Sequence, residues 1–164
     1  MCGRAAVIVY PVQHAEAMSK EEHPDRPLSE LGRQHAQWTA DLAAKLGVHV
    51  KEIRHSGKTR AKETAEIMAQ ALSPAQGVLA GSGLGPLDDV EPVAEEIDRA
   101  SQALLLVGHL PFMERLAGWV LSGDARQPVI DFTNAGIVCL EKGDNRWQAT
   151  WIITPDVAEI KSQV

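Results

Sequence analysis

Two apolar runs that each lead to a histidine constrain this chain more than any other feature. The first covers Ala5–Gln13 and stops at His14, and the second covers Ala103–Val107 and reaches His109 after one glycine. Runs so rich in Val, Ile and Leu are typical of strands buried on both faces of a parallel sheet. Because ligands bind beyond the carboxyl ends of such strands, the two histidines are candidates for one shared pocket if their strands are neighbours.

Helix-like and strand-like patterns alternate along the rest of the chain. Ser29 and Asp89 are predicted N-caps, and helical spacing of apolar residues marks four inner faces, at Leu31–Leu46, Ala61–Leu72, Val93–Ile97 and Phe112–Val120. Further strands are predicted over Val48–His55 and Val78–Ala80, and a terminal hairpin over Gly136–Glu141 and Trp147–Ile153. We therefore expect one α/β domain over residues 1–164, with three layers (α/β/α) and a mostly parallel sheet that ends in an antiparallel hairpin.

Composition excludes several classes of function. The net charge of -6 argues against a nucleic-acid partner, and no apolar run approaches the roughly 20 residues of a membrane helix. Cys2 and Cys139 are far apart and have no metal-type spacing, so reduced thiols in a cytoplasmic protein are the simplest interpretation. HxH, HExxH and CxxC patterns are missing, so we expect no metal and no cofactor.

Positive charge gathers where the second helix is expected to begin. Lys58, Arg60 and Lys62 lie there, with Arg54 just before them. A helix N-terminus and an arginine fork both favour a bound anion. We expect Lys58 and Lys62 to point to solvent and Arg60 to face the pocket. Arg26, on the loop after His14, is a second candidate to contact the ligand.

A structural interpretation of the two histidines stays open at this point. Either imidazole can simply satisfy a buried carbonyl group, and for one histidine alone this explanation is as good as a functional one. The presence of a histidine after each of two strong strands favours function. His35, on the apolar side of a helix, is expected at the edge of the core.

Four blocks of sequence resemble the histidine phosphatase superfamily, and most closely its small SixA-type phosphohistidine phosphatases. The blocks occur in the family's order along almost the whole chain, and the terminal hairpin also resembles the small members. They are Gln13-His14-Ala15-Glu16-Ala17, Arg26-Pro27-Leu28-Ser29 followed by Gly32, Ser56 with Arg60-Ala61 and Thr64-Ala65, and Gly108-His109-Leu110-Pro111.

The resemblance implies a phosphoglycerate mutase-like fold and a phosphatase in which His14 is the nucleophile. Arg60, Arg26 and His109 would bind the phosphate and stabilise the charge of the transition state. The candidates for an acid that protonates a leaving group are Glu16, Asp88 and Asp89. The substrate would be a phosphohistidine in a protein domain, another phosphorylated side chain or a small phosphate ester. The loop over residues 15–28 is short, which favours a shallow site open to a protein substrate.

Two positions depart from the family pattern. Gln13 stands where the family has an arginine of the phosphate clamp, and Ala15 stands where it has a glycine. Loss of one charged contact to a transition state costs on the order of 2–4 kcal/mol. Gln13 can still donate a hydrogen bond, and Lys58 is a possible replacement charge. The alternative function is therefore a catalytically weak or inactive phosphate-binding module that uses Gln13 and the same cations.

Overall fold

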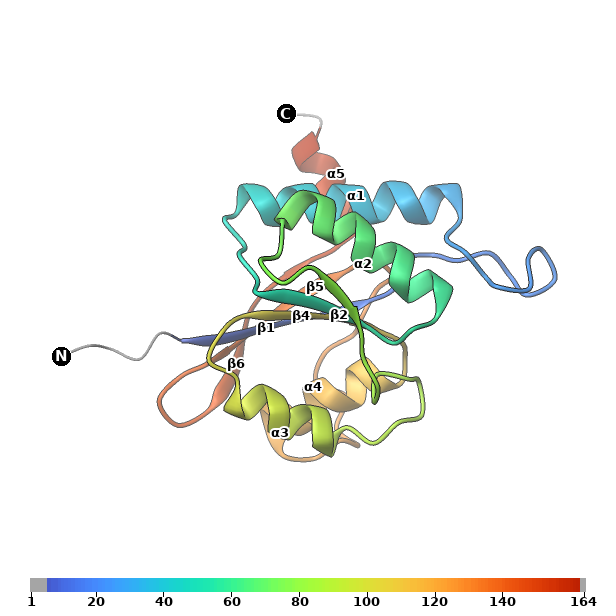
Figure 1. Ribbon diagram of the computed structural model, residues 1–164. Coiled ribbons are helices and arrows are strands. Elements are labelled where there is room, and N and C mark those ends of the chain that lie inside the picture. The colour runs from blue at the N-terminus through green and yellow to red at the C-terminus, as the bar shows by residue number, and fades with distance from the viewer. Residues whose placement is uncertain (1–5, 163–164) are drawn as a thin grey trace.

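The computed structural model describes residues 6–162, which form a six-stranded sheet between two layers of helices (Figure 1). The order across the sheet is β3-β2-β4-β1-β5-β6. The first four strands in that order are parallel, and β5 and β6 are antiparallel to their neighbours. The strands are β1 (Val7–Gln13), β2 (Glu52–His55), β3 (Val78–Ala80), β4 (Leu104–Gly108), β5 (Ile137–Lys142) and β6 (Trp147–Ile153). The predicted fold class is confirmed.

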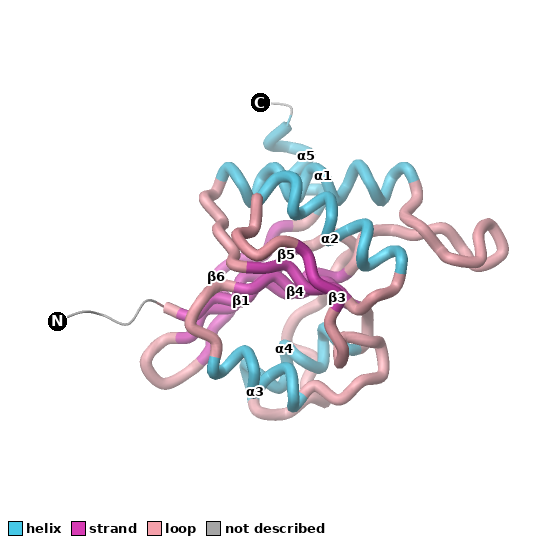
Figure 2. The backbone as a smooth tube through the Cα atoms, viewed as in Figure 1, coloured by secondary structure: helices cyan, strands magenta, loops and turns pink. Residues whose placement is uncertain are grey.

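The helices cover both faces of the sheet, as Figure 2 shows. One layer holds α1 (Glu30–Lys45), α2 (Thr59–Leu72) and α5 (Pro155–Ser162), and the other holds α3 (Glu91–Arg99) and α4 (Phe112–Ser122). Alternate residues of the central strands enter the two cores. Leu105 and Val107 pack with α1 and α2, whereas Leu104 and Leu106 pack with α3 and α4. This double burial explains why β4 is apolar at every position but its last.

The strands that lead to the two histidines are neighbours, as predicted. β1 pairs with β4 in parallel, with Gln13 opposite Gly108, and the His14 N–H donates to the Gly108 carbonyl at 3.0 Å. Pro11 does not end β1, because its pairing with β4 continues to Gln13, and the pairing with β5 skips the proline, which has no N–H to donate. The carboxyl ends of β1 and β4 therefore lie side by side.

Three local predictions need correction. The strand predicted over Val48–His55 begins only at Glu52, because Val48 and Val50 are buried in an irregular connection, where their side chains alternate without a strand partner. Asp89 precedes the N-cap of α3, which is Val90, and its carboxylate accepts a hydrogen bond from Glu91 N. The final helix, α5, was not predicted, since few of its residues are buried.

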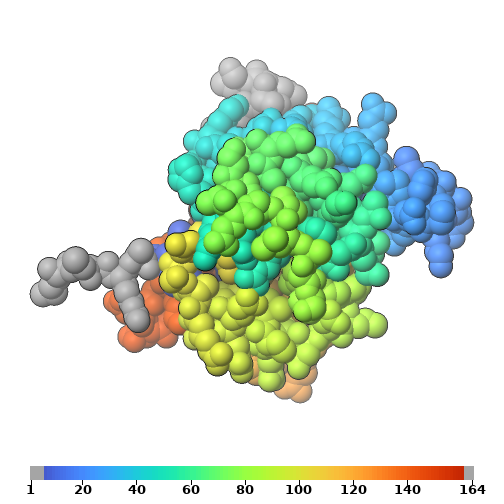
Figure 3. Space-filling model, viewed as in Figure 1, coloured from blue at the N-terminus to red at the C-terminus, as the bar shows by residue number. Residues whose placement is uncertain are grey.

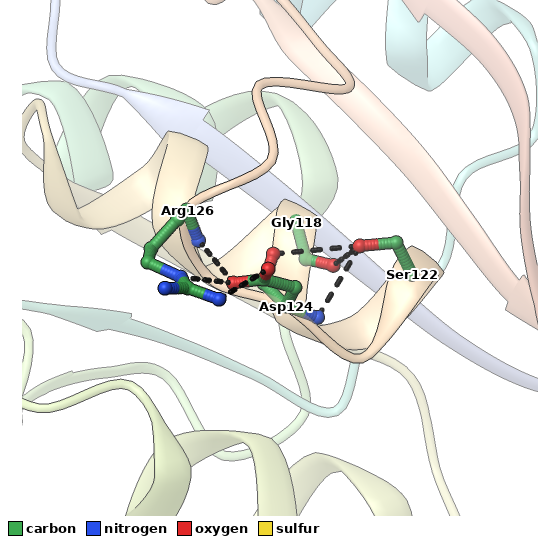
Figure 4. Close-up of polar contacts among 4 residues, drawn as sticks. All are labelled: Gly118, Ser122, Asp124 and Arg126. Carbon is green, nitrogen blue, oxygen red and sulfur yellow. Dashed lines mark hydrogen bonds and ion pairs between the residues drawn. The ribbon is translucent and has the colours of Figure 1, made fainter.

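The turn that follows α4 packs against the helix itself and requires a glycine there, at position 118. Gly123 has φ 78° and ends α4, after which the chain folds back over Gly118, where an added Cβ would lie 2.5 Å from the Gln127 carbonyl oxygen. Figure 4 shows the polar contacts of this turn. Ser122 Oγ donates to Gly118 O at 2.8 Å, and Arg126 Nε donates to Asp124 Oδ1 at 3.0 Å.

The segment between β1 and α1 projects from the body of the molecule as a lobe (Figure 3, blue). A bridge between Ala17 and Leu28 closes its base, and Ser29 caps α1 by accepting a hydrogen bond from Gly32 N. Cys139 is a free, buried thiol, whereas Cys2 lies outside the described residues. No helix within residues 6–162 is long and apolar enough to cross a membrane.

Candidate functional site

His14 and His109 meet just beyond the carboxyl ends of β1 and β4. Their ring centroids are 5.0 Å apart, and the ring planes are inclined at 53°. Two further side chains from the segment after β2 contact these rings. Arg60 Nε lies 3.3 Å from His14 Nε2, and Ser56 Oγ lies 2.5 Å from His109 Nε2. The sheet thus brings the histidines and Arg60 together from three separate parts of the sequence, which is the arrangement that the sequence predicted.

The imidazole of His14 is neutral and held in one tautomer. Its Nδ1 lies 2.7 Å from the Ala15 carbonyl oxygen, which only accepts, so Nδ1 carries the proton. The pKa of His14 is lowered to about 4, chiefly by burial; the Ala15 hydrogen bond opposes this change, and the charges of Arg60 and Arg26 add to it. At neutral pH the lone pair of His14 is therefore at Nε2, next to Arg60.

The imidazole of His109 is more deeply buried, with 2% of its surface exposed. Burial lowers its pKa to about 3, and the charges of His14, Arg60, Lys58 and Arg26 contribute in that order. Within the described part of the chain, the buried Nδ1 has no hydrogen-bond partner. This buried ring nitrogen therefore has an unmet hydrogen-bonding capacity, while Nε2 is the nitrogen that Ser56 contacts.

The backbone on either side of His14 is fixed by hydrogen bonds from two elements. Thr64 Oγ1, on α2, accepts from Ala15 N at 3.0 Å and donates to Arg60 O at 2.8 Å. Asn134 Nδ2 donates to the His14 carbonyl at 2.9 Å, and Ala135 N donates to the Gln13 carbonyl at 3.0 Å. Sequence reasoning missed Asn134. A polar residue just before the terminal hairpin indicates a turn, but nothing local identifies what its amide binds.

The predicted cations divide into two groups. Arg60 and Arg26 have no carboxylate partner among the described residues, and burial together with the charge of Arg26 lowers the pKa of Arg60. Arg26 donates from Nε to the Met18 carbonyl at 3.1 Å. Arg54, in contrast, is ion-paired to Glu52 and Glu96 on the α3 side of the sheet. Positive charge without a partner is thus concentrated near His14.

Gln13 and the three acid candidates do not complete the site in the expected way. The Gln13 side-chain oxygen is buried and, in residues 6–162, has no hydrogen-bond partner. Each carboxylate accepts a hydrogen bond away from the histidines: Asp88 from Gly85 N and Asp89 from Glu91 N within local turns, and Glu16 from Ser29 Oγ, 13 residues later. All three acids are exposed, and no hydrogen bond or ion pair joins any of them to either histidine.

Cavity volume does not identify this site. Two cavities, of about 470 and 420 Å³, lie on the α3 side of β2 and share Glu52, Arg54 and Glu96 in their linings. Neither is lined by a histidine. Across the described ranges, no three His, Cys, Asp or Glu side chains are grouped to hold a metal ion. The histidine site instead offers a nucleophilic nitrogen and uncompensated guanidinium groups, a combination suited to a tetrahedral oxyanion.

The sequence matches known proteins along most of its length. A sequence model of the histidine phosphatase superfamily (branch 1) matches residues 9–80. An uncharacterised protein of Picosynechococcus sp. is 32% identical over 140 residues, which cover 82% of this chain and 83% of that protein. The range matched by the family model includes most of the strand that leads to His14 and the whole helix that carries Arg60.

Solved structures of phosphatases share the fold. The protein histidine phosphatase SixA in complex with tungstate superimposes with a TM-score of 0.80 at 21% identity, covering 91% of this chain and 97% of that one. A protein from Agrobacterium tumefaciens described as a putative phosphohistidine phosphatase SixA has a TM-score of 0.74 at 25% identity, covering 90% and 98% of the two chains.

Proposed function

Since this chain belongs to the histidine phosphatase superfamily, we propose that it hydrolyses phosphohistidine through a phosphorylated intermediate on His14. Family membership and the phosphatase neighbours support phosphatase activity in general. The identity of the substrate and the roles of the individual residues are our proposal. A phosphorylated protein domain is the proposed partner, with another phosphorylated side chain or a small phosphate ester as the wider class. A cytoplasmic location stays a prediction.

One observation carries the proposal, namely the hydrogen bond from His14 Nδ1 to the Ala15 carbonyl. It supports Nε2 as the nucleophilic atom, because the proton is held on the opposite side of the ring. The low pKa, about 4, keeps that nitrogen unprotonated across the physiological range. Arg60, which contacts Nε2 in the free protein, is then in position to transfer its hydrogen bond to an oxygen of the incoming phosphoryl group.

The proposed reaction has two steps. His14 Nε2 forms a bond to phosphorus as the bond from phosphorus to the leaving group breaks, and the leaving nitrogen or oxygen takes a proton from water. A second water then attacks phosphorus as the bond to His14 Nε2 breaks, and its proton neutralises the hydroxide left by the first step, which releases inorganic phosphate and restores the neutral imidazole. Arg60, Arg26 and His109 bind the phosphoryl oxygens throughout. Each step requires positioning and charge stabilisation more than acid–base chemistry.

The environment of the acid candidates favours phosphohistidine over an alkyl phosphate. Glu16, Asp88 and Asp89 are exposed, and each accepts a hydrogen bond from a group outside the histidine pair. An alkoxide leaving group needs a proton from a nearby acid, whereas the imidazole of a phosphohistidine leaves without a strong acid because its P–N bond is labile. Because no carboxylate in residues 6–162 contacts either histidine, the site holds no evident acid for a leaving group, which favours the P–N substrate.

A trapping experiment tests the proposal. The protein is mixed with a phosphohistidine peptide or with p-nitrophenyl phosphate, quenched without acid and digested, and the modified residue is located by mass spectrometry. We expect phosphate on His14, release of inorganic phosphate, and loss of both in His14→Ala. His23→Ala is the matched control, because His23 is exposed in the projecting lobe. Turnover that survives in His14→Ala would contradict the proposed mechanism.

The alternative function is a module that binds phosphorylated ligands without hydrolysing them. The specific observation in its favour is Gln13, whose buried and unpaired amide oxygen occupies the place of a cationic group. Binding of the phosphohistidine peptide by calorimetry distinguishes the two functions. A module retains affinity in both wild type and His14→Ala and labels neither, whereas the proposed enzyme labels His14 in the wild type.

A further inference from the structure

We propose that Lys58 supplies the phosphate-binding cation that Gln13 does not provide. The proposal rests on the proposed function, since it assigns a further binding group to the same site. Lys58 is exposed, as the sequence predicted, but its neighbours suggest that it also acts on a ligand at the site. The ligand is the phosphoryl group itself, so inorganic oxyanions are valid probes of the proposal even without turnover.

The position of Lys58 places it next to the histidine pair. Ser56 Oγ lies 2.5 Å from His109 Nε2 and accepts a hydrogen bond from Lys58 N at 3.4 Å. Both contacts meet at one oxygen atom, so the Lys58 backbone is separated from the His109 ring by a single hydroxyl group. A lysine side chain is long and flexible enough to cross that distance. Lys58 therefore has access to any phosphoryl group bound between the two histidines.

The charge of Lys58 is uncompensated. In residues 6–162 it makes no ion pair, whereas Lys62, one helical turn later, lies 3.8 Å from Glu66. The Lys58 charge also contributes to the low pKa of His109, which indicates that it acts on this ring across the intervening space. A free cation next to a buried neutral imidazole is stabilised when an anion binds there.

Lys58 is also unfavourable for the helix that it begins. It is the N-cap of α2 and makes no side-chain capping hydrogen bond. Ser, Thr, Asp and Asn are preferred at this position, and a cation at a helix N-terminus opposes the helix dipole. A residue that costs helix stability, makes no ion pair within residues 6–162 and lies beside the proposed site is better explained by ligand binding than by folding.

Gln13 explains why the site needs an additional cation. Gln13 ends β1 immediately before His14, and its amide carries no charge. Two guanidinium groups, Arg26 and Arg60, remain near His14 without a carboxylate partner. A phosphoryl group that carries two negative charges in its transition state is better stabilised by three cations than by two.

A double-mutant cycle tests the proposal. Lys58→Gln is expected to lower both kcat/KM and the affinity for orthovanadate by about tenfold to a hundredfold, the usual effect of one charged hydrogen bond. Gln13→Arg, which adds a cation from the other side, is expected to make Lys58→Gln nearly silent, so that the two changes are strongly non-additive. Lys62→Gln is the matched control on the same helix and is expected to stay within about twofold of wild type.

A second variant separates binding from folding. Lys58→Ser installs a preferred N-cap, so its unfolding temperature is expected to rise while vanadate affinity falls. The proposal is overturned if Lys58→Gln and Lys58→Ser both bind vanadate as tightly as wild type, or if Gln13→Arg and Lys58→Gln have additive effects. Because vanadate binding is read without turnover, failure of this proposal is distinguishable from failure of the proposed function, which the label on His14 decides.

Discussion

Arg54 and Arg60 lie close together in sequence, yet their surroundings have opposite electrostatic character. Arg54, in β2, contacts Glu52 and Glu96, and hydrogen bonds to these carboxylates raise its pKa although burial opposes the change. Arg60, in the first turn of α2, has a lowered pKa because of burial and the charge of Arg26. Arg54 is a neutralised structural charge, whereas Arg60 is a positive charge that is available to a ligand.

The surroundings of Arg54 and Arg60 also differ in cavity volume. The cavities of about 470 and 420 Å³ are next to Arg54, while the histidines and the uncompensated cations are next to Arg60. Empty volume therefore lies beside compensated charge. For an anionic ligand of a few atoms, the unpaired charge is the better guide, because a phosphoryl group needs donors more than it needs space.

The largest expected effect comes from exchanging the two arginines for glutamine one at a time. Arg60→Gln is expected to lower kcat/KM by about a hundredfold to a thousandfold, because it removes a charged donor from the transition state. Arg54→Gln is expected to stay within about threefold of wild type, since no reacting atom is near it. Steady-state hydrolysis of p-nitrophenyl phosphate measures both. Equal losses of kcat/KM in the two variants would show that the two arginines do not differ in function.

Lowering the pH is expected to lower the free energy of unfolding because His14 is buried in its neutral form. His14 is neutral when folded, with a pKa of about 4, whereas an unfolded histidine titrates near 6.5. Between these values the unfolded chain binds more protons, so the free energy of unfolding falls as pH falls from 6.5 to about 4, by on the order of 3 kcal/mol. Urea unfolding at several pH values measures this slope. His14→Asn is expected to have a shallower slope, and an unchanged slope would contradict the assignment.

Removal of the Arg54 side chain is expected to affect stability alone. Arg54→Met leaves the carboxylate of Glu52, which is 5% exposed, without its partner, at a cost on the order of 1–3 kcal/mol. Arg99→Met is the control, since its pair with Glu95 is exposed and is worth less than about 0.5 kcal/mol. Chemical denaturation compares the two variants. A loss of vanadate affinity in Arg54→Met would place Arg54 in the site after all.

The smallest expected effect concerns the support of His14. Asn134→Ala removes the donor to the His14 carbonyl and is expected to lower kcat by about tenfold with little change in KM, since the loop carrying the nucleophile loses one anchor. Asn145→Ala, in the hairpin turn, is the matched control. A rise in KM with unchanged kcat would indicate that Asn134 binds substrate instead of positioning His14.

Local patterns predicted the fold and the principal members of the candidate site. Strands β1 and β4 are nearly all apolar, so their type and their burial could be inferred, and their histidines follow directly at the strand ends. Arg60 was also found, because it begins a helix whose inner face is periodic. These features depend on residues that are close in sequence.

Contacts between distant segments could not be predicted. Arg54 and Arg60 are the same residue type in one basic stretch, and what separates them is Glu96, a residue of α3 that packs below β2. Asn134 binds a carbonyl 120 residues away. The three acid candidates were selected for charge, but their carboxylates accept hydrogen bonds that only the folded backbone defines. For Arg54 and Asn134 a partner distant in sequence decides the role of the side chain, whereas for Asp88 and Asp89 the local backbone conformation decides it.

The hydrogen bond between Asn134 and the His14 carbonyl has a consequence for the order of assembly. The four sequence blocks end at Pro111, yet the nucleophile loop is held by a turn that leads into β5 and is synthesised later. A nascent chain that has emerged only as far as α4 contains both histidines and all the proposed cations, but lacks this anchor. Contacts of such large sequence separation carry a high loop-closure entropy and slow folding. The anchored geometry of His14 can therefore form only after the chain has been made as far as Asn134 and Ala135.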